Sequence, residues 1–169
     1  MKEHTIEEWF HSYEKDVTSF LVYFTGSLDV EDYVQDTFLI ALRQFSSFNA
    51  SSHPKTWLIS IARNQVIDRY RRKMVWERLK LVLSNEYTSQ NVTEIHFMQK
   101  LEHNELNRAI QQLSPAYREV VILRGIMELS SKEASFILQC SPNKVNVMFH
   151  RSLKKLKMIL EKEGFSYEG

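Results

Sequence analysis

The strongest structural signal in the sequence is a helical pattern over residues 57–72. Its apolar residues recur every four positions: Leu58, Ala62, Val66 and Tyr70. This spacing puts them on one side of an α-helix, so the stretch predicts an amphipathic helix with a buried face. His53-Pro54 is a suitable start, because the missing N–H of proline costs nothing in the first turn of a helix.

The other side of this predicted helix is polar and basic. It carries Ser60, Arg63, Asn64 and Arg71. Arginine suits backbone phosphates and a side-chain amide suits base edges, so the face is chemically fit to bind nucleic acid. An ordinary solvated helix surface would have a similar composition. Both interpretations stay open on this stretch alone.

The rest of the chain also favours helices. Only three prolines and four glycines occur in 169 residues, strand-like alternation is nearly absent, and 43% of the residues are hydrophobic. Trp9, Trp57 and Trp76 are predicted to anchor the core. Cys140 is the single cysteine, which excludes an intramolecular disulfide. We expect a soluble cytoplasmic protein, because no signal-peptide core and no apolar run of roughly 20 residues occurs.

The net charge of +1 conceals a strong segregation along the chain. Residues 1–48 have nine acids and three bases, whereas residues 53–80 have eight bases and two acids. Residues 81–112 are mildly acidic, and residues 113–169 have nine bases against six acids. Two separate basic segments indicate a chain that binds nucleic acid at two sites, and the acidic segment indicates a surface that binds a protein partner.

The periodicity divides the chain into two helical units. In the first, helices are expected over 6–25, 29–45 and 54–72, with Asp29 as the N-cap of the second. Residues 75–83 could extend the third helix, whereas the polar run 84–91 is typical of a linker. We expect a flexible linker over about 81–97. The predicted domains are therefore 1–80 and 98–169.

The second unit contains a helix-turn-helix pattern. A capping box at Ser130–Glu133 opens a short helix, Gln139-Cys140 forms the turn, and Ser141-Pro142 starts a longer helix. The outer side of the longer helix carries Asn143, Lys144, Asn146, Val147, His150, Arg151 and Lys154. In a DNA-binding unit these residues would enter the major groove. An antiparallel helical hairpin with a basic surface is the alternative.

Several motifs, in order, resemble the extracytoplasmic-function (ECF) branch of the sigma-70 family. They are DVEDYVQDTF at 29–38, Phe48 followed by WLISIARN at 57–64, Asp68, Arg71-Arg72, LSPAYREV at 113–120, SKEAS at 131–135, and FHRSLKKLK at 149–157. The resemblance implies an all-α fold with two small domains, a sigma-2-like helical bundle and a sigma-4-like helix-turn-helix domain. It also implies a promoter-specificity subunit of bacterial RNA polymerase, without enzymatic activity, cofactor, metal or small-molecule substrate.

The resemblance also implies a role for particular residues. Those expected to bind the clamp helices of the largest polymerase subunit are Asp29, Glu31, Asp32, Gln35 and Asp36. Those expected to bind the −10 element, partly as a pocket for a flipped base, are Phe48, Asn49, Ser60, Arg63, Asn64, Arg69, Arg71 and Arg72. The outer residues of the longer helix, from Asn143 to Lys154, would read the −35 element, and the other face of that domain would hold the polymerase flap. An anti-sigma factor is an expected further partner.

Several positions depart from the family pattern. Gln139 stands where a glycine is often found, although glutamine adopts positive φ less readily than glycine does. Asn146, Val147 and Met148 replace small and basic residues early in the predicted recognition helix, which leaves the −35 affinity open. A stand-alone helix-turn-helix regulator that never binds polymerase is the main alternative function, and a helical adaptor that binds only protein is a second.

Overall fold

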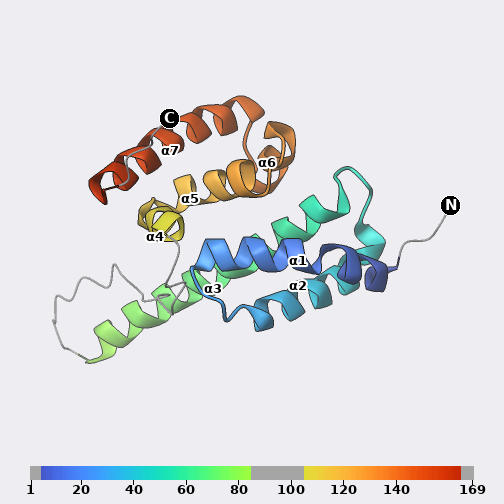
Figure 1. The fold of residues 1–169 in the computed structure, drawn as a ribbon. Helices are drawn as coiled ribbons and strands as arrows, with labels where there is room; N and C mark the ends of the chain where they lie inside the picture. Colours follow the sequence, from blue (N-terminus) through green and yellow to red (C-terminus); the bar gives the residue numbers. More distant parts are fainter. Residues whose placement is uncertain (1–4, 85–104, 165–169) are drawn as a thin grey trace.

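The computed structural model describes residues 5–84 and 105–164, and every regular element within these ranges is helical (Figure 1). This confirms the predicted all-α fold. The elements are α1 (Ile6–Thr25), α2 (Glu31–Gln44), the short 3-10 helix η1 (Phe45–Ser47), α3 (Pro54–Ser84), α4 (Glu105–Gln112), α5 (Pro115–Val121), the π-helical turn η2 (Ile122–Ile126), α6 (Ser131–Leu138) and α7 (Pro142–Lys162).

The first unit is a bundle of α1, α2 and α3 around an apolar core. Val17, Phe20, Leu21 and Leu58 have no measurable exposure, which fits the helical spacing of apolar residues in the sequence. Helix α1 begins with a capping box between Thr5 and Glu8 and ends at Gly26, whose φ is 71°. In the region where α2 starts, the expectation of an Asp29 cap is wrong. Val30 is the N-cap residue and makes no side-chain cap bond, while the backbone N–H of Asp29 donates to Ser27 Oγ at 3.0 Å.

Helix α3 includes the segment 75–83, which the sequence left open as a helical extension. It continues past Arg72 to Ser84, four residues into the expected linker. No glycine or proline interrupts residues 73–84, so nothing local stops the helix where its core contacts end. Trp76 lies on this extension and is 58% exposed, so the expectation that it anchors the core is wrong. The remainder of the expected linker lies outside the described residues, as do the first residues of the predicted second domain.

The second unit contains the predicted helix-turn-helix. The capping box is confirmed, because Ser130 Oγ accepts from Glu133 N at 3.1 Å and Glu133 Oε2 accepts from Ser130 N at 2.7 Å. Gln139 ends α6 with φ 54°, so the left-handed position expected from the glycine pattern is real and is occupied by glutamine. Ser141 then caps α7, with Pro142 in its first turn.

The two units pack against each other in a closed arrangement (Figure 1). Buried apolar side chains from both units form one continuous cluster, and α6 lies along α3. The C-terminal end of α1 is capped from across the interface, where Gln111 Nε2 donates to the Tyr23 carbonyl at 2.7 Å and Arg118 Nη1 to the Phe24 carbonyl at 3.5 Å. The closed arrangement therefore satisfies backbone groups that would otherwise need water.

The described residues contain neither a membrane-spanning helix nor a cluster of metal-ligating side chains. None of the helices there combines the length and the apolar character needed to cross a bilayer. Nowhere in 5–84 or 105–164 do three or more His, Cys, Asp or Glu side chains gather as a possible metal site.

Candidate nucleic-acid and protein interfaces

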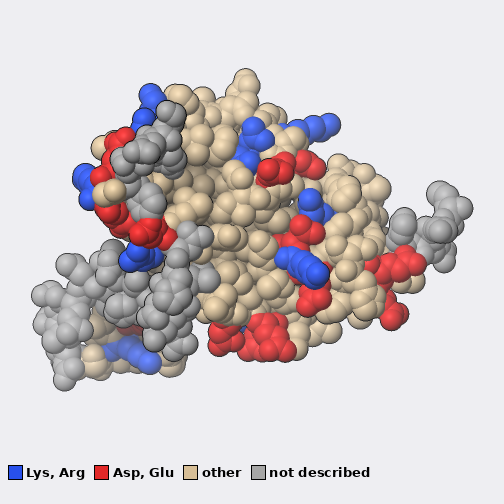
Figure 2. Space-filling view, viewed as in Figure 1, with Lys and Arg blue, Asp and Glu red and all other residues tan. Residues whose placement is uncertain are grey.

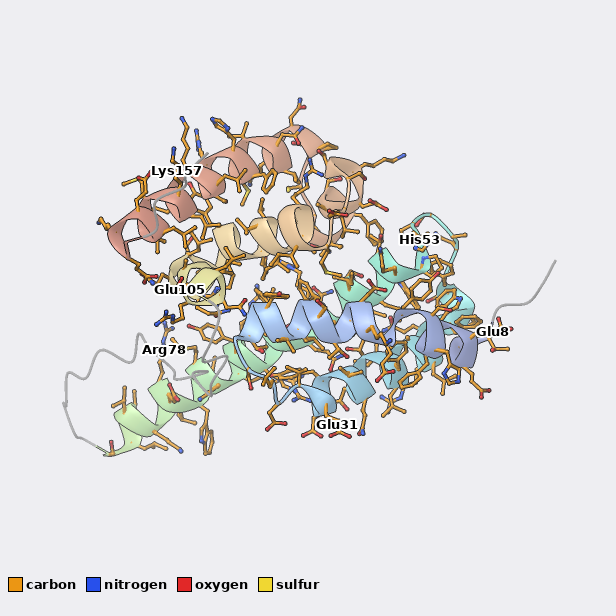
Figure 3. The ribbon with its side chains drawn as sticks, viewed as in Figure 1. Glu8, Glu31, His53, Arg78, Glu105 and Lys157 are labelled. Carbon is orange, nitrogen blue, oxygen red and sulfur yellow. The ribbon has the colours of Figure 1, made fainter. Side chains whose placement is uncertain are left out.

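One surface of the first unit gathers carboxylates on α2 and the turn before it. Asp29, Glu31, Asp32 and Gln35 are all exposed there. Figure 2 shows acidic atoms clustered over the start of α2, where Glu31 is labelled in Figure 3. Asp36, the fifth residue expected here, is half-buried and forms an ion pair with Arg69 of α3.

Sequence reasoning missed two leucines on this surface. Leu39 and Leu42 are 49% and 54% exposed. Leu39 follows Asp32 by seven residues, or about two turns, and Leu42 follows Gln35 by the same distance, so all four share one side of α2. The signal was present in the sequence, because neither leucine falls on the core spacing of Val34, Phe38 and Ala41. We call Asp29, Glu31, Asp32, Gln35, Leu39 and Leu42 the acidic face.

Three of the expected −10 residues share one side of α3. Asn64 follows Ser60 by four residues and Arg71 follows Asn64 by seven, a helical spacing that aligns them. Asn64 and Arg71 are exposed. Ser60 is half-buried and its hydroxyl donates to the Trp57 carbonyl at 2.6 Å. We call Ser60, Asn64 and Arg71 the −10 face.

The aromatic residue expected to stack on a flipped base is packed among other rings. The ring centroid of Phe48 lies 4.9 Å from Trp9 and 5.1 Å from Trp57, and the side chain is half-buried. The neighbouring Asn49 is exposed, and its Oδ1 accepts from the Ser51 backbone N–H at 3.0 Å. Phe48 therefore anchors the start of the loop 49–53 to the core, while Asn49 lies on the solvent-exposed surface of that loop.

Two of the expected DNA-binding arginines differ sharply in their surroundings. Arg72 is exposed. Arg69 pairs with Asp36, and its guanidinium carbon lies 4.3 Å from the ring centroid of Tyr33. These contacts tie α3 to α2. Arg69, which was expected to bind DNA, is thus paired with Asp36, which was expected to bind polymerase.

Arg63 lies in the interface between the two units. Its Nε donates to Glu119 Oε1 at 3.0 Å and its Nη2 to Oε2 at 3.2 Å. The two side chains are only 18% and 8% exposed, which makes this a buried, two-pronged ion pair. Burial raises the pKa of Glu119 despite the opposing effects of Arg63 and Arg118. In the closed arrangement, Arg63 is consequently not available to DNA.

The outer side of α7 presents its expected residues to solvent. All seven are exposed: Asn143, Lys144, Asn146, Val147, His150, Arg151 and Lys154. Asn146 is also fixed, because Ser131 Oγ donates to its Oδ1 at 2.5 Å across the turn between α6 and α7. The inner side is buried through Val145, Ser152 and Leu156. Helix α7 therefore packs through one side and leaves the seven expected residues on the other side accessible to solvent.

Comparison with known proteins gives matches over most of the chain. The model of sigma-70 region 2 matches residues 9–74, and that of sigma-70 region 4 matches residues 103–156. The RNA polymerase sigma factor YlaC of Bacillus subtilis is 31% identical over 162 residues, which cover 94% of this chain and 93% of YlaC. The ECF RNA polymerase sigma factor SigX of the same organism is 30% identical, with 94% of this chain and 85% of SigX covered.

Two solved structures share the fold. The sigma factor RpoE of Bartonella quintana, in complex with the anti-sigma factor NepR, has a TM-score of 0.72 and 23% identity, with 92% of this chain and 96% of that chain covered. CnrH in complex with the cytosolic domain of CnrY has a TM-score of 0.66 and 23% identity, with 94% and 89% covered.

Proposed function

The chain belongs to the ECF branch of the sigma-70 family of RNA polymerase sigma factors, and on this premise we propose which surfaces bind polymerase and which bind the promoter. Sigma factors of this branch bind bacterial core RNA polymerase and direct promoter-specific transcription initiation, and they are not enzymes. The observation that carries the assignment of surfaces is the separation, on one chain, of an acidic face from two polar helix faces suited to DNA.

The acidic face is the polymerase-binding surface. Its carboxylates repel phosphate, so DNA is a poor ligand for it. Leu39 and Leu42 strengthen the assignment, because exposed apolar side chains rimmed by polar groups mark protein interaction sites and contribute nothing to phosphate binding. The clamp helices of the largest subunit are the proposed partner. Asp36 acts mainly through Arg69, by fixing α2 against α3.

The −10 face reads the promoter element nearer the transcription start. Asn64 is placed to contact a base edge, and Arg71 to contact the phosphates beside it. The loop from Asn49 to His53, supported by Phe48, forms a wall of the pocket for a flipped base, whose unpairing costs a few kcal/mol. Arg63 joins this surface only when the two units separate.

Replacing Asn64 by alanine is expected to change the base preference at one promoter position, at a cost of about 1–3 kcal/mol. Arg71→Ala should instead weaken all promoters alike and reduce the salt dependence, because it removes a phosphate contact. The measurement is transcription from a promoter library with core polymerase, with Arg108→Ala as control, since Arg108 is exposed and far along the chain on α4. An unchanged base preference with Asn64→Ala would refute the pocket.

The outer side of α7 is the proposed −35 reader. Its amides and lysines lie near the start of the helix, where base edges come within reach, and Arg151 and Lys154 lie further along, where phosphates do. Because Asn146 accepts a hydrogen bond from Ser131, its amide nitrogen is the group left to face DNA. The opposite side of this domain is the proposed site for the polymerase flap.

The closed arrangement is proposed to open when polymerase binds. The −10 and −35 elements are read by separate domains spaced by the polymerase, so the two domains act as a bivalent clamp. In the closed arrangement, Glu119 holds Arg63 and α6 lies along α3 beside the −10 face. The boundary of the first domain is proposed at the end of α3, at Ser84, rather than at residue 80.

Two further properties are proposed on the family premise. RpoE is known in a complex with the anti-sigma factor NepR, and an inhibitor of this kind is proposed here too. The chain is proposed to act in the cytoplasm, where core polymerase and promoter DNA are found.

A further inference from the structure

The last turns of α3 expose a continuous strip of large apolar side chains. Their exposed fractions are 65% for Val75, 58% for Trp76, 45% for Leu79, 75% for Val82 and 77% for Leu83. Steps of four and seven residues link them, so they lie on one side of the helix. We call these five residues the apolar stripe.

Basic residues flank the apolar stripe along both edges. Arg71 and Arg78 are seven residues apart on one side, and Lys73 and Lys80 are seven apart on the other, with Arg72 at the start of the stripe. Glu77 is the only acid between residues 71 and 80, and it is half-buried on the side of the helix away from the apolar stripe. The Nζ of Lys80 lies 5.5 Å from the ring centroid of Trp76.

This part of α3 lies clear of the bundle. Figure 1 shows the end of α3 extending beyond the other helices, and Figure 3 places Arg78 on this extension. DNA alone does not account for the stripe, because apolar side chains gain nothing from phosphates. The core does not need it either, since the bundle is already filled by the residues of its buried cluster.

We propose that the apolar stripe binds the surface of a bilayer that contains anionic lipids, with this part of α3 lying in the plane of the membrane. An apolar face rimmed by lysine and arginine, with tryptophan at its edge, is the pattern of helices that lie in the headgroup region. The cations contact anionic headgroups while their aliphatic stems lie along the acyl boundary.

A bilayer fits this surface better than a protein groove does. The stripe lies on the outside of a projecting, convex helix, and cations line both of its edges. A protein partner would need a groove with acidic rims on two sides at matching positions. An anionic bilayer supplies negative charge on every side and an apolar layer between, without any requirement for matched shape.

The location of the stripe has a consequence for DNA binding. Val75 follows Arg71 by four residues and Asn64 by eleven, or about three turns, so the apolar stripe continues the −10 face along the same side of α3. A membrane on this side would cover Asn64 and Arg71. Lipid and promoter DNA should therefore compete for this side of α3. The expected competition rests on the proposed function, whereas lipid binding itself does not.

The test uses the full chain and vesicles of phosphatidylglycerol mixed with phosphatidylcholine, compared with phosphatidylcholine alone, by co-sedimentation at low salt. We expect binding to the anionic vesicles to be at least about tenfold stronger than to the neutral ones. Leu79→Glu with Val82→Glu should reduce this binding by about tenfold or more. Leu39→Glu with Leu42→Glu makes the same change on α2 and should leave lipid binding unchanged.

Each remaining outcome has a definite meaning. Circular dichroism checks that both double variants stay folded, as expected for exposed positions. Absence of vesicle binding, or binding that Leu79→Glu with Val82→Glu does not reduce, would overturn the proposal. Self-association that this variant abolishes, without any vesicle binding, would assign the stripe to a second copy of the chain instead. If vesicles bind the chain but do not displace holoenzyme from promoter DNA, the expected competition is wrong while membrane binding by the apolar stripe stands.

Discussion

Replacing Asp32 and Leu39 together by arginine is expected to abolish co-purification of the chain with core RNA polymerase. Both side chains lie on the acidic face, and Leu39 is 49% exposed without a role in the core. Two cations at the centre of an interface built on carboxylates and leucines would add repulsion to the loss of contacts. We expect a fall in affinity of about 100-fold or more, equivalent to ~3 kcal/mol.

The control for this experiment is a charge change of similar kind on another helix. Glu7→Arg with Glu14→Arg alters two exposed carboxylates of α1 and should leave polymerase binding intact. Asp32 and Leu39 are preferred to Asp36, because loss of Asp36 would also release Arg69 and disturb the contact between α2 and α3. Retained binding in the Asp32 and Leu39 variant would show that polymerase contacts another surface.

Glu119→Ala is expected to open the closed arrangement of the free chain. The substitution leaves the Arg63 guanidinium in the interface without its partner, and breaking a buried ion pair in this way costs about 3–5 kcal/mol. Because the Arg63 side chain keeps 18% exposure, we expect the lower end of this range, about 3 kcal/mol. Small-angle X-ray scattering should then show a larger radius of gyration.

A matched control separates opening from general destabilisation. Glu105→Ala removes one partner of an exposed ion pair with Arg108, at 3.8 Å, and should change neither stability nor shape by a measurable amount. The charge swap of Arg63→Glu with Glu119→Arg should restore part of the compact form. A radius of gyration unchanged by Glu119→Ala would show that the apolar contacts alone hold the units together.

The raised pKa of Glu119 also predicts how closure depends on pH. The cost of burying the Glu119 carboxylate outweighs the effects of the two arginines, so the closed form favours the protonated acid, which can still accept from Arg63, relative to an exposed Glu119 with its ordinary pKa. Its contribution to closure is therefore complete below the ordinary carboxyl pKa and is lost as pH rises through the raised value. The radius of gyration should increase over that window in the parent chain, and Glu119→Gln should remove the dependence.

Local features of this fold were predictable because they depend on neighbours in sequence. The Ser130–Glu133 capping box and the exposed side of α7 follow from residues within one or two turns. Gln139 at positive φ follows in the same way, since a helix that ends before a tight turn requires a left-handed residue there.

Tertiary pairings were not predictable, because helical periodicity shows which residues share a face but not which faces meet. Arg63 has the pattern of a solvated or DNA-binding residue, yet its partner, Glu119, is 56 positions away. Arg69 is similarly taken up by Asp36. In both cases a charge expected to face an external ligand is paired within the chain.

The end of α3 was left open by the sequence for a different reason. The apolar stripe lies beyond the last core contacts, so the pattern of buried positions that defines residues 57–72 is absent there. The helix continues because nothing between Lys73 and Leu83 breaks it. The helix end predicted at residue 72 was based on the spacing of buried positions and not on helix propensity.

The most direct test of the central claim is selection of duplexes from a random DNA library by the chain alone, by core polymerase alone, and by both together. Our account predicts specific enrichment only with both, as two conserved elements held at a fixed spacing, because each domain alone binds weakly and polymerase sets their separation. Enrichment of a palindrome by the free chain, bound as a dimer with nanomolar affinity, would contradict it and would identify a stand-alone regulator.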